Sequence, residues 1–402
     1  MSASYDPRAP APPGYIPLSV PHCGGNEWKY VKECLDTAWI SSAGPFVDRF
    51  ERMIAEYVGS NFAVATINGT AALHTALMVM GVKRDDEVLT STLTFIAPAN
   101  AIRYVGAWPV FIDAEPNFWQ MDLQKLIDFL RNSCKRVSGN VINKTTGRRV
   151  RAILPVHILG HPCEMNTLKS ISQEYQLPII EDATEALGAT FQGLMAGTIG
   201  DIGCFSFNGN KLVTTAGGGM IVTNNEELAG RARYLTTQAK DDSVEFVHGE
   251  IGYNYRLSNV HAAIGCAQLE QISEFIERKR RIAANYSNAF STIPGITTMR
   301  ESGMVRSVYW MYTVLVDSGL FGMDSRRLLK YLESERIQTR PLWQPIHLSK
   351  AHADGQATDC SVAEFLNKSA LSLPCSVGLS TSDQARVVEC IQAACRIVTR
   401  SN

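Results

Sequence analysis

The chain has 402 residues, of which 45% are hydrophobic and 19% are charged. These values are typical of a globular protein that can bury a sizeable core, and they exclude a fibrous or disordered chain. The formal net charge is −1, so no overall field attracts nucleic acid or an anionic membrane, and an anionic ligand needs a local site.

The N-terminal segment, residues 1–15, is rich in proline and predicts a loose arm. It lacks the order of charged and then apolar residues that marks a signal peptide, and no run of about 18 apolar residues could span a membrane. The ten cysteines form no CxxC pair and lie among apolar neighbours, as reduced thiols do. We therefore expect a cytoplasmic protein without nucleic-acid or membrane partners.

Alternating strands and helices begin at residue 62. Two amphipathic helices come first, because apolar residues recur at helical spacing over 28–35 and 46–57. The repeated order of strand, short loop and helix then predicts a mostly parallel sheet covered by helices. The expected strands are 62–67, 87–90, 108–112, 152–156, 178–180, 202–207 and 219–222, and the expected helices are 71–80, 96–105, 123–130 and 165–175.

Two further segments shape the domain prediction. The polar, basic stretch 133–151 contains turn signals and predicts a solvated hairpin or loop, which we favour over contact with a nucleotide phosphate. A long helical pattern over 259–287 leads to a region with a strand at 309–316 and helices at 325–334 and 383–398. We therefore expect a large α/β domain over 16–265 and a smaller C-terminal α+β domain over 266–402.

Spacing excludes several common chemistries. No Gly-Lys dipeptide occurs, so the chain has no P-loop. His157 and His161 are four residues apart, but they bracket Ile-Leu-Gly after a strand and have no glutamate between them. We interpret them as structural histidines rather than zinc ligands, and we expect no metal site.

Lys211 is the most informative residue in the sequence. Most lysines lie on helix surfaces, but Lys211 stands in FNGNKLVTTAGGG, among small and polar residues that suggest backbone folded tightly around a ligand. A lysine drawn into such a site can form a Schiff base. Chemistry with pyridoxal phosphate (PLP) is the hypothesis that follows.

The other parts that PLP needs each have a candidate. Asp182 ends an apolar strand and could keep the pyridine nitrogen protonated, although alone it would be read as a helix N-cap. Gly69 and Thr70 lie at a strand-to-helix turn, where backbone N–H groups can bind a phosphate. Phe95 follows another strand and could cover the cofactor ring, although a lone aromatic residue there is more often part of the core.

In this order the segments resemble the DegT/DnrJ/StrS type of PLP-dependent nucleotide-sugar aminotransferases, from about Ile16 to the C-terminus. The matching motifs are NGTAALHTAL, TLTFIAPANAIRYVGA, LPVHILGHPCEM, IIEDATEALGA, GDIGCFSFNGNKLVTTAGGGMIV, EIGYNYRLSN and TRPLWQPIH. The resemblance implies an α/β protein of PLP fold type I, with a mixed, mostly parallel sheet and a smaller C-terminal α+β domain.

The resemblance also implies roles for residues. Lys211 would form the Schiff base with the cofactor, and Asp182 would pair with its pyridine nitrogen. Gly69, Thr70 and Ser206 would hold the phosphate from one subunit of a homodimer.

Four further residues take their roles from the same resemblance. Asn254 would reach the phosphate from the other subunit, so that the active site is composite. Phe95 would stack on the cofactor ring, and Glu185 would lie near its 3-hydroxyl group. Arg256 and His347 would lie near the sugar nucleotide.

Three segments narrow the expected substrate. IPLSVPHCGGNEWKYVKECLDT, the 133–151 insertion and LTTQAKDD resemble the branch that aminates UDP- or GDP-linked 4-keto-6-deoxy-N-acetylhexosamines on the way to UDP-N-acetylbacillosamine or legionaminic acid. The implied reaction moves the amino group of L-glutamate to C4 of a nucleotide-linked 2-acetamido-2,6-dideoxy-4-keto-hexose, and we expect the nucleotide to be UDP. The product would be a 4-amino sugar for the biosynthesis of bacterial surface glycans.

Two alternatives stay open. Relatives that remove a hydroxyl group carry histidine at the lysine position, so Lys211 favours transamination. A PLP-binding regulator would need a DNA-binding segment or a basic face, and neither is evident in this neutral chain. A PLP-dependent dehydratase or lyase would be recognised by its failure to form 2-oxoglutarate in stoichiometric amounts.

Overall fold

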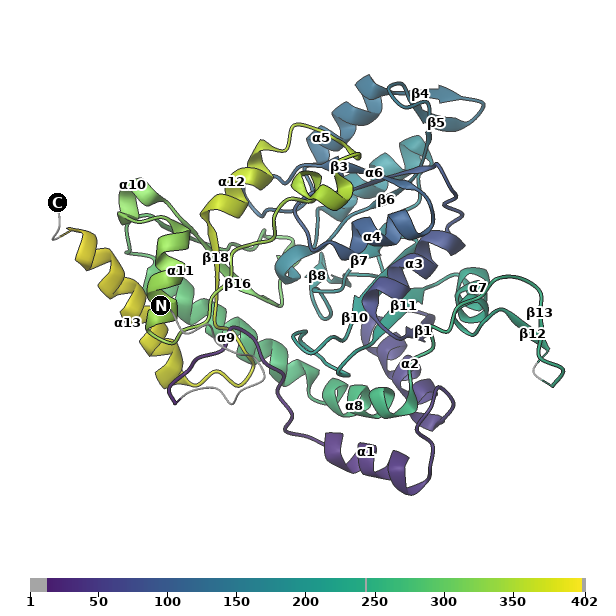
Figure 1. Ribbon diagram of the computed structural model, residues 1–402, viewed down its shortest axis with the longest axis horizontal. Helices are drawn as coiled ribbons and strands as arrows, with labels where there is room; N and C mark the ends of the chain where they lie inside the picture. The colour runs from purple at the N-terminus through teal and green to yellow at the C-terminus, as the bar shows by residue number, and fades with distance from the viewer. Residues whose placement is uncertain (1–12, 243, 400–402) are drawn as a thin grey trace.

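The computed structural model describes residues 13–242 and 244–399 (Figure 1). Most of the predicted arm of residues 1–15 lies outside the described residues. The two expected leading helices are confirmed as α1 (Glu27–Asp36) and α2 (Pro45–Val58). Helix α2 begins with a proline, whose fixed φ suits the first turn, and ends at Gly59 with φ of 73°.

A mixed sheet forms the centre of the molecule. Its strands run in the order β1-β11-β10-β7 in one part and β17-β3-β2-β6-β5-β4 in the other. The parallel bridges Ile153–Ile179 and Val156–Asp182 join β6 to β7 and so connect the two parts. The strands are β1 (Phe62–Thr66), β2 (Glu87–Ser91), β3 (Trp108–Ile112), β4 (Cys134–Val137), β5 (Asn140–Asn143), β6 (Arg149–Leu154), β7 (Ile180–Asp182), β10 (Ile202–Ser206), β11 (Gly219–Thr223) and β17 (Gln356–Ala357).

The strand directions agree with the expected fold. Strands β3, β2, β6, β7 and β10 are parallel, whereas β11 is antiparallel to its neighbours β1 and β10. Strand β11 follows β10 after a loop only, without a crossover helix, so an antiparallel pair is the arrangement available to it. The prediction of a mixed, mostly parallel sheet is confirmed.

Helices pack against this sheet, and α3 is one of the most apolar and most buried of them. Helix α3 contacts β10, β11 and α4, and eight of its eleven residues are buried. Helix α7, which the sequence analysis missed, contacts β1 and β11. The helices of this region are α3 (Gly69–Val79), α4 (Ala97–Tyr104), α5 (Leu123–Asp128), α6 (Met165–Tyr175) and α7 (Glu226–Thr236).

The single long helix expected over 259–287 is wrong. The structure has α8 (Asn259–Leu269) and α9 (Ile272–Phe290), with non-helical backbone at Gln271. The Gln271 side chain donates hydrogen bonds to Ala267 and to Glu27, so contacts with another part of the chain stabilise the break. The apolar spacing continues across it, and periodicity therefore gives no sign of it.

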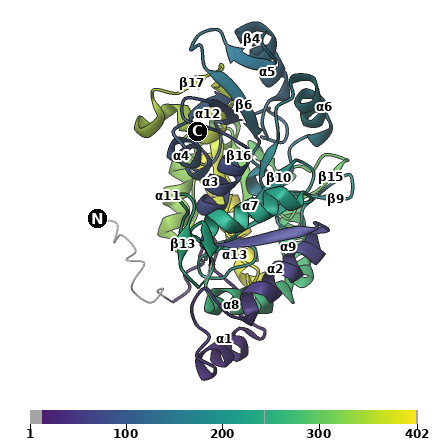
Figure 2. The same ribbon diagram turned by 90° about the vertical axis from the view of Figure 1, so that its right-hand side faces the viewer.

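The C-terminal part contains a separate antiparallel sheet, β14-β16-β18, which lies beside α9, α11 and α13. Helix α13 packs next to α9, as Figure 1 and Figure 2 both show. Helices α11 and α13 were expected from the sequence, whereas α12 and the two outer strands were not. The buried apolar core continues from the central sheet into this part. The elements are β14 (Ile296–Thr298), β16 (Tyr312–Val316), β18 (Ala370–Leu373), α10 (Ser318–Phe321), α11 (Ser325–Ser334), α12 (Ser361–Ser369) and α13 (Thr381–Thr399).

The basic stretch 133–151 contains the predicted hairpin, formed by β4 (Cys134–Val137) and β5 (Asn140–Asn143). Strand β5 pairs with the first residues of β6, Arg149 and Val150. The hairpin therefore extends the sheet at the amino end of β6, at the top of Figure 1, whereas ligands of such sheets collect at the carboxyl ends of the strands. This placement opposes contact with a nucleotide phosphate in the same chain.

No helix among residues 13–242 and 244–399 is long and apolar enough to cross a lipid bilayer. Seven of the ten cysteines are buried, in agreement with their apolar neighbours in the sequence. Within the same residues, no group of three or more His, Cys, Asp and Glu side chains could hold a metal ion.

Glu181 on β7 is a buried carboxylate that holds several segments together. It accepts hydrogen bonds from the backbone N–H groups of Gly197, Ile199 and Gly200. Nδ1 of His157 accepts the N–H of Cys163, so Nε2 carries the ring proton and donates it to Glu181 over 2.8 Å. His157 therefore has a structural role, as expected.

We predict that Glu181→Gln lowers the free energy of unfolding by about 2–3 kcal/mol, because an amide nitrogen in place of one oxygen leaves at least one buried N–H group without an acceptor. Urea unfolding measures this as a lower midpoint at an unchanged m-value. Glu227→Gln, at an exposed position on α7, is the control. If Glu181→Gln lowers the free energy of unfolding no more than the control does, the loop 197–200 does not depend on this carboxylate.

Candidate active site

A cavity of about 350 Å³ lies beyond the carboxyl ends of β1, β2, β7 and β10. Each of these strands leads directly into residues that line it, as expected for a sheet of this type. Seven of the sequence-predicted site residues meet here: Gly69, Thr70, Phe95, Asp182, Glu185, Ser206 and Lys211.

Lys211 reaches the cavity from the loop between β10 and β11. Backbone hydrogen bonds from Phe207 to Gly218 and from Thr215 to Phe207 close this loop at its base. At Gly219 an added Cβ would lie 2.5 Å from the main chain of Asn68. The glycine therefore allows β11 to start against the turn that precedes α3, and it brings Lys211 and that turn to one site.

The Lys211 amine has two close neighbours. Its Nζ lies 3.5 Å from Oε1 of Glu185 and 4.1 Å from the centroid of the Trp310 ring. Its side chain is only 14% exposed and lines the cavity, so the amine is largely shielded from bulk solvent and faces the space where a ligand would bind.

Asp182 is a buried carboxylate at the end of β7. Burial raises its pKa above the ordinary value, while the N–H group of Thr184 at 3.1 Å and the charge of Lys211 act in the opposite direction. A cationic group in the cavity would offset the cost of this buried charge. Asp182 is therefore placed to hold a protonated ring nitrogen.

Glu185 is also buried, with 6% of its surface exposed. Burial raises the pKa of Glu185 to about 7, against the opposing effects of Lys211 and of the Leu159 N–H group. That N–H group donates to Oε2 over 2.8 Å, from a residue with φ of 60°. The loop 158–160 thus fixes the carboxylate beside the lysine.

The first turn of α3 forms one wall of the cavity. Asn68 caps this helix by accepting the N–H of Ala71 over 2.8 Å. A Cβ on Gly69 would lie 2.8 Å from Cβ of Ser206, so only glycine allows this close approach. The first N–H groups of a helix have no intrahelical acceptor and favour an anion, and the Ser206 hydroxyl group lies beside them.

Aromatic side chains complete the cavity. Phe95 lines the cavity and is 57% exposed, so its ring is accessible to a ligand. Trp310 and Trp343, which the sequence analysis did not single out, stack in parallel, with an interplanar angle of 4° and centroids 6.3 Å apart. The only sequence signal for Trp343 is its place within TRPLWQPIH.

Three predicted site residues lie outside the lining of this cavity. Asn254 forms a β-bridge with Thr237. Arg256 forms ion pairs with Glu51 at 2.7 Å and Asp48 at 3.3 Å. His347 shares a hydrogen bond of 2.7 Å between Nδ1 and the Thr92 hydroxyl group, and its Nε2 lies 3.4 Å from Glu364.

The residues present fit PLP. One cavity contains an amine that can bond to its aldehyde, a buried carboxylate for its ring nitrogen, a helix N-terminus with a serine for its phosphate and an exposed aromatic face for its ring.

Comparisons with known proteins agree. Residues 21–392 match the DegT/DnrJ/EryC1/StrS aminotransferase family. The chain is 40% identical, over 93% of its length and 94% of the relative's, to EpsN of Bacillus subtilis, which is named as a pyridoxal phosphate-dependent aminotransferase. It is 38% identical, over 93% of its length and 96% of the relative's, to GDP-perosamine synthase of Caulobacter vibrioides.

A solved structure gives the same answer at the level of the fold. The aminotransferase TlmJ of Streptoalloteichus hindustanus is 28% identical and superposes with a TM-score of 0.86. The superposition covers 96% of this chain and 100% of the TlmJ chain. The chain therefore belongs to the DegT/DnrJ/EryC1/StrS aminotransferase family and is a PLP-dependent sugar aminotransferase of fold type I.

Proposed function

We propose that the chain transfers the amino group of L-glutamate to C4 of a 4-keto-6-deoxyhexose linked to a nucleoside diphosphate. The observation that carries the proposal is the meeting of Lys211, Asp182 and Glu185 in one cavity beside a phosphate-binding turn. The expected acceptor is a UDP-linked 2-acetamido-2,6-dideoxy-4-keto sugar. A GDP-linked sugar is the second candidate, because a relative 38% identical is named GDP-perosamine synthase.

When bound, PLP supplies an electron sink for the bond that breaks at the donor's α-carbon. Lys211 would hold the cofactor, and its Nζ, when not bonded to the cofactor, would accept the proton that leaves the α-carbon of glutamate. Asp182 would hold the proton on the ring nitrogen, and Gly69, Thr70 and Ser206 would bind the phosphate, while Glu185 lies beside the lysine in the buried wall. In the half-reaction with the keto sugar, Nζ would give a proton to C4, the carbon that receives the amino group.

The experiment incubates the PLP-loaded protein with glutamate and UDP- or GDP-linked 4-keto-6-deoxy sugars, each with and without the 2-acetamido group. Mass spectrometry and NMR identify the product, and 2-oxoglutarate is quantified. One 2-oxoglutarate per amino sugar supports the proposal. A dehydrated or cleaved sugar would favour the dehydratase or lyase, and PLP binding without turnover of any of these sugars would favour the regulator. Lys211→Ala is the inactive control.

We predict that Asp182→Asn retains PLP but loses roughly 100-fold or more of the rate, because a neutral amide cannot balance the charge of the protonated ring nitrogen. Single-turnover measurements with glutamate report this step alone. Asp324→Asn, at the exposed N-cap of α11, is the matched control. A rate within a few-fold of the parent would assign the role to another group.

Glu185 makes the stability of the PLP-free protein depend on pH. Its pKa of about 7 in the folded protein lies above the ordinary value of 4.5, so between these values the folded state binds more protons than the unfolded state. The free energy of unfolding therefore falls as pH rises from about 4.5 to about 7, by up to roughly 3 kcal/mol.

We predict that Glu185→Gln removes this fall. Urea unfolding at several pH values gives the free energy of unfolding of wild type and variant. The contributions of the other titrating groups cancel in the difference between the two. Glu227→Gln serves as the control for loss of an exposed carboxylate. Parallel pH profiles for wild type and Glu185→Gln would show that the carboxyl group titrates normally.

The assembly that we propose is a homodimer with composite active sites. Asn254 lies outside the cavity of its own chain, next to a segment with exposed apolar side chains. In this segment Val244, Phe246 and Ile251 are 79%, 65% and 83% exposed. It includes the hairpin of β12 (Lys240–Asp242) and β13 (Val247–His248), which projects from the body in Figure 1. A second copy of the chain would bury these side chains.

Mixed dimers test this assembly. We predict that Lys211→Ala and Asn254→Asp are each weak or inactive, the second because a carboxylate repels the phosphate. Refolding the two variants together restores up to about a quarter of wild-type activity, since half of randomly paired dimers contain one intact site of two. Demonstrated subunit exchange without recovery would show that Asn254 does not act in the partner's site.

A further inference from the structure

Trp310 contacts the loop between β10 and β11, which carries Lys211, at two places. Lys211 Nζ lies 4.1 Å from the centroid of its ring, and its Nε1–H group donates to the main-chain oxygen of Asn210 over 2.9 Å. Asn210 immediately precedes Lys211. One indole side chain therefore contacts both the amine and the backbone that presents it.

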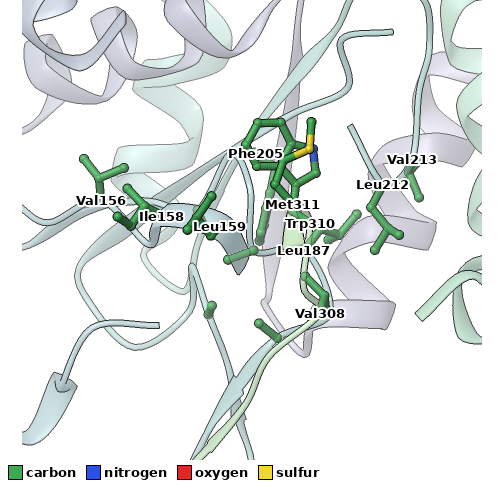
Figure 3. Packing of buried hydrophobic residues seen from close by; sticks show 14 of the residues in the cluster. Val156, Ile158, Leu159, Leu187, Phe205, Leu212, Val213, Val308, Trp310 and Met311 are labelled. Carbon is green, nitrogen blue, oxygen red and sulfur yellow. The ribbon is translucent and has the colours of Figure 1, made fainter. Parts of the chain in front are cut away.

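Trp310 is itself held rigidly. It is 5% exposed, and Figure 3 shows it among buried apolar side chains that include Leu187 and Met311. Its main-chain oxygen accepts a hydrogen bond of 2.7 Å from Nζ of Lys279, a buried lysine on α9. Its ring lies parallel to that of Trp343, with the centroids 6.3 Å apart. Burial and the hydrogen bond of its main chain with Lys279 hold Trp310 in place.

The charged groups around the Lys211 amine lie on the β7 side of the cavity. Glu185 is 3.5 Å away, and the buried carboxylate of Asp182 also interacts with the lysine. The Trp310 ring adds a contact that is independent of these carboxylates, since an aromatic face attracts an ammonium group and does not titrate.

We infer that Trp310 is a positioning residue for Lys211, whose ring face attracts the ammonium form of the lysine in the PLP-free protein. The inference deepens the proposed function and rests on it in one respect, that Lys211 is the group that bonds to PLP. An aromatic face attracts an ammonium group but not a neutral amine, and the Lys211 nitrogen lies over this ring.

The test measures how fast the PLP-free protein captures PLP. The two are mixed rapidly at a series of pH values, and the change in the visible absorbance of PLP gives the capture rate at each pH. In capture the neutral Lys211 nitrogen attacks the aldehyde carbon, a C=N bond replaces the C=O bond, and water leaves. The proton of the ammonium group must first go to solvent, so the capture rate rises with pH as the amine is deprotonated.

We predict that Trp310→Leu moves the midpoint of this rise to lower pH by about half a unit to one unit, and that capture on the rising part of the profile is about three to ten times faster than in wild type. Trp343→Leu removes the neighbouring tryptophan of the same cavity and leaves the midpoint unchanged. The Trp310→Leu shift persists in a Glu185→Gln background, because the ring acts independently of that carboxylate.

An unchanged midpoint in Trp310→Leu, or an equal shift in Trp343→Leu, would overturn the inference, as would slower capture at the wild-type midpoint. If Trp310→Leu does not fold, Trp310→Phe carries the test. Its weaker ring predicts a smaller shift in the same direction, and no shift or an upward shift overturns the inference. Failure of the proposed function is distinguishable, since Lys211→Ala would then capture PLP as fast as wild type.

Discussion

Two consecutive buried carboxylates at the end of β7 set the arrangement of the whole site. Successive side chains of a strand point to opposite sides of the sheet, so Glu181 and Asp182 cannot share one environment. Glu181 is satisfied by three backbone N–H groups and by His157. Asp182 has the N–H group of Thr184 and the charge of Lys211. One carboxylate stabilises the fold, and the next remains available to a cationic ligand.

The charges in the cavity explain why the site suits a cofactor that carries a positive ring nitrogen and a negative phosphate. The cavity contains one lysine facing two buried carboxylates, Asp182 and Glu185. A protonated pyridine nitrogen would balance the charge of Asp182, and a phosphate would bind at the N-terminus of α3, at a distinct place in the cavity. Lys211 would then supply the amine that bonds to the aldehyde.

Much of this arrangement could be predicted from the sequence. Parallel strands end at the same edge of a sheet, so the segments after four expected strands were bound to meet, and they do so with Thr70, Phe95, Asp182 and Ser206 in one cavity. The glycines of the loop after Lys211 signalled its close packing, which Gly219 confirms. Strand ends and glycine-rich loops are set by neighbouring residues, so their order along the chain can be predicted from the sequence.

Other features depend on contacts between distant segments. The strand expected from residue 309 begins at Tyr312, and Tyr309 has φ of 48°, so Trp310 lies in a loop beside Lys211 rather than in the sheet core. The break before α9 depends on the bond between Gln271 and Glu27. Arg256 pairs with Thr66 as an isolated β-bridge and with Glu51 as an ion pair, and neither contact leaves a periodic signal.

Reductive trapping tests most directly whether Lys211 is the group that bonds to the cofactor. The PLP-loaded protein is reduced with borohydride, digested and examined by mass spectrometry. We predict one pyridoxyl group per chain, on the peptide that contains Lys211, and none at any lysine in Lys211→Arg. A pyridoxyl group on another lysine of the active protein, with Lys211 unmodified, would contradict the assignment on which the site, its charge balance and the role of Trp310 depend.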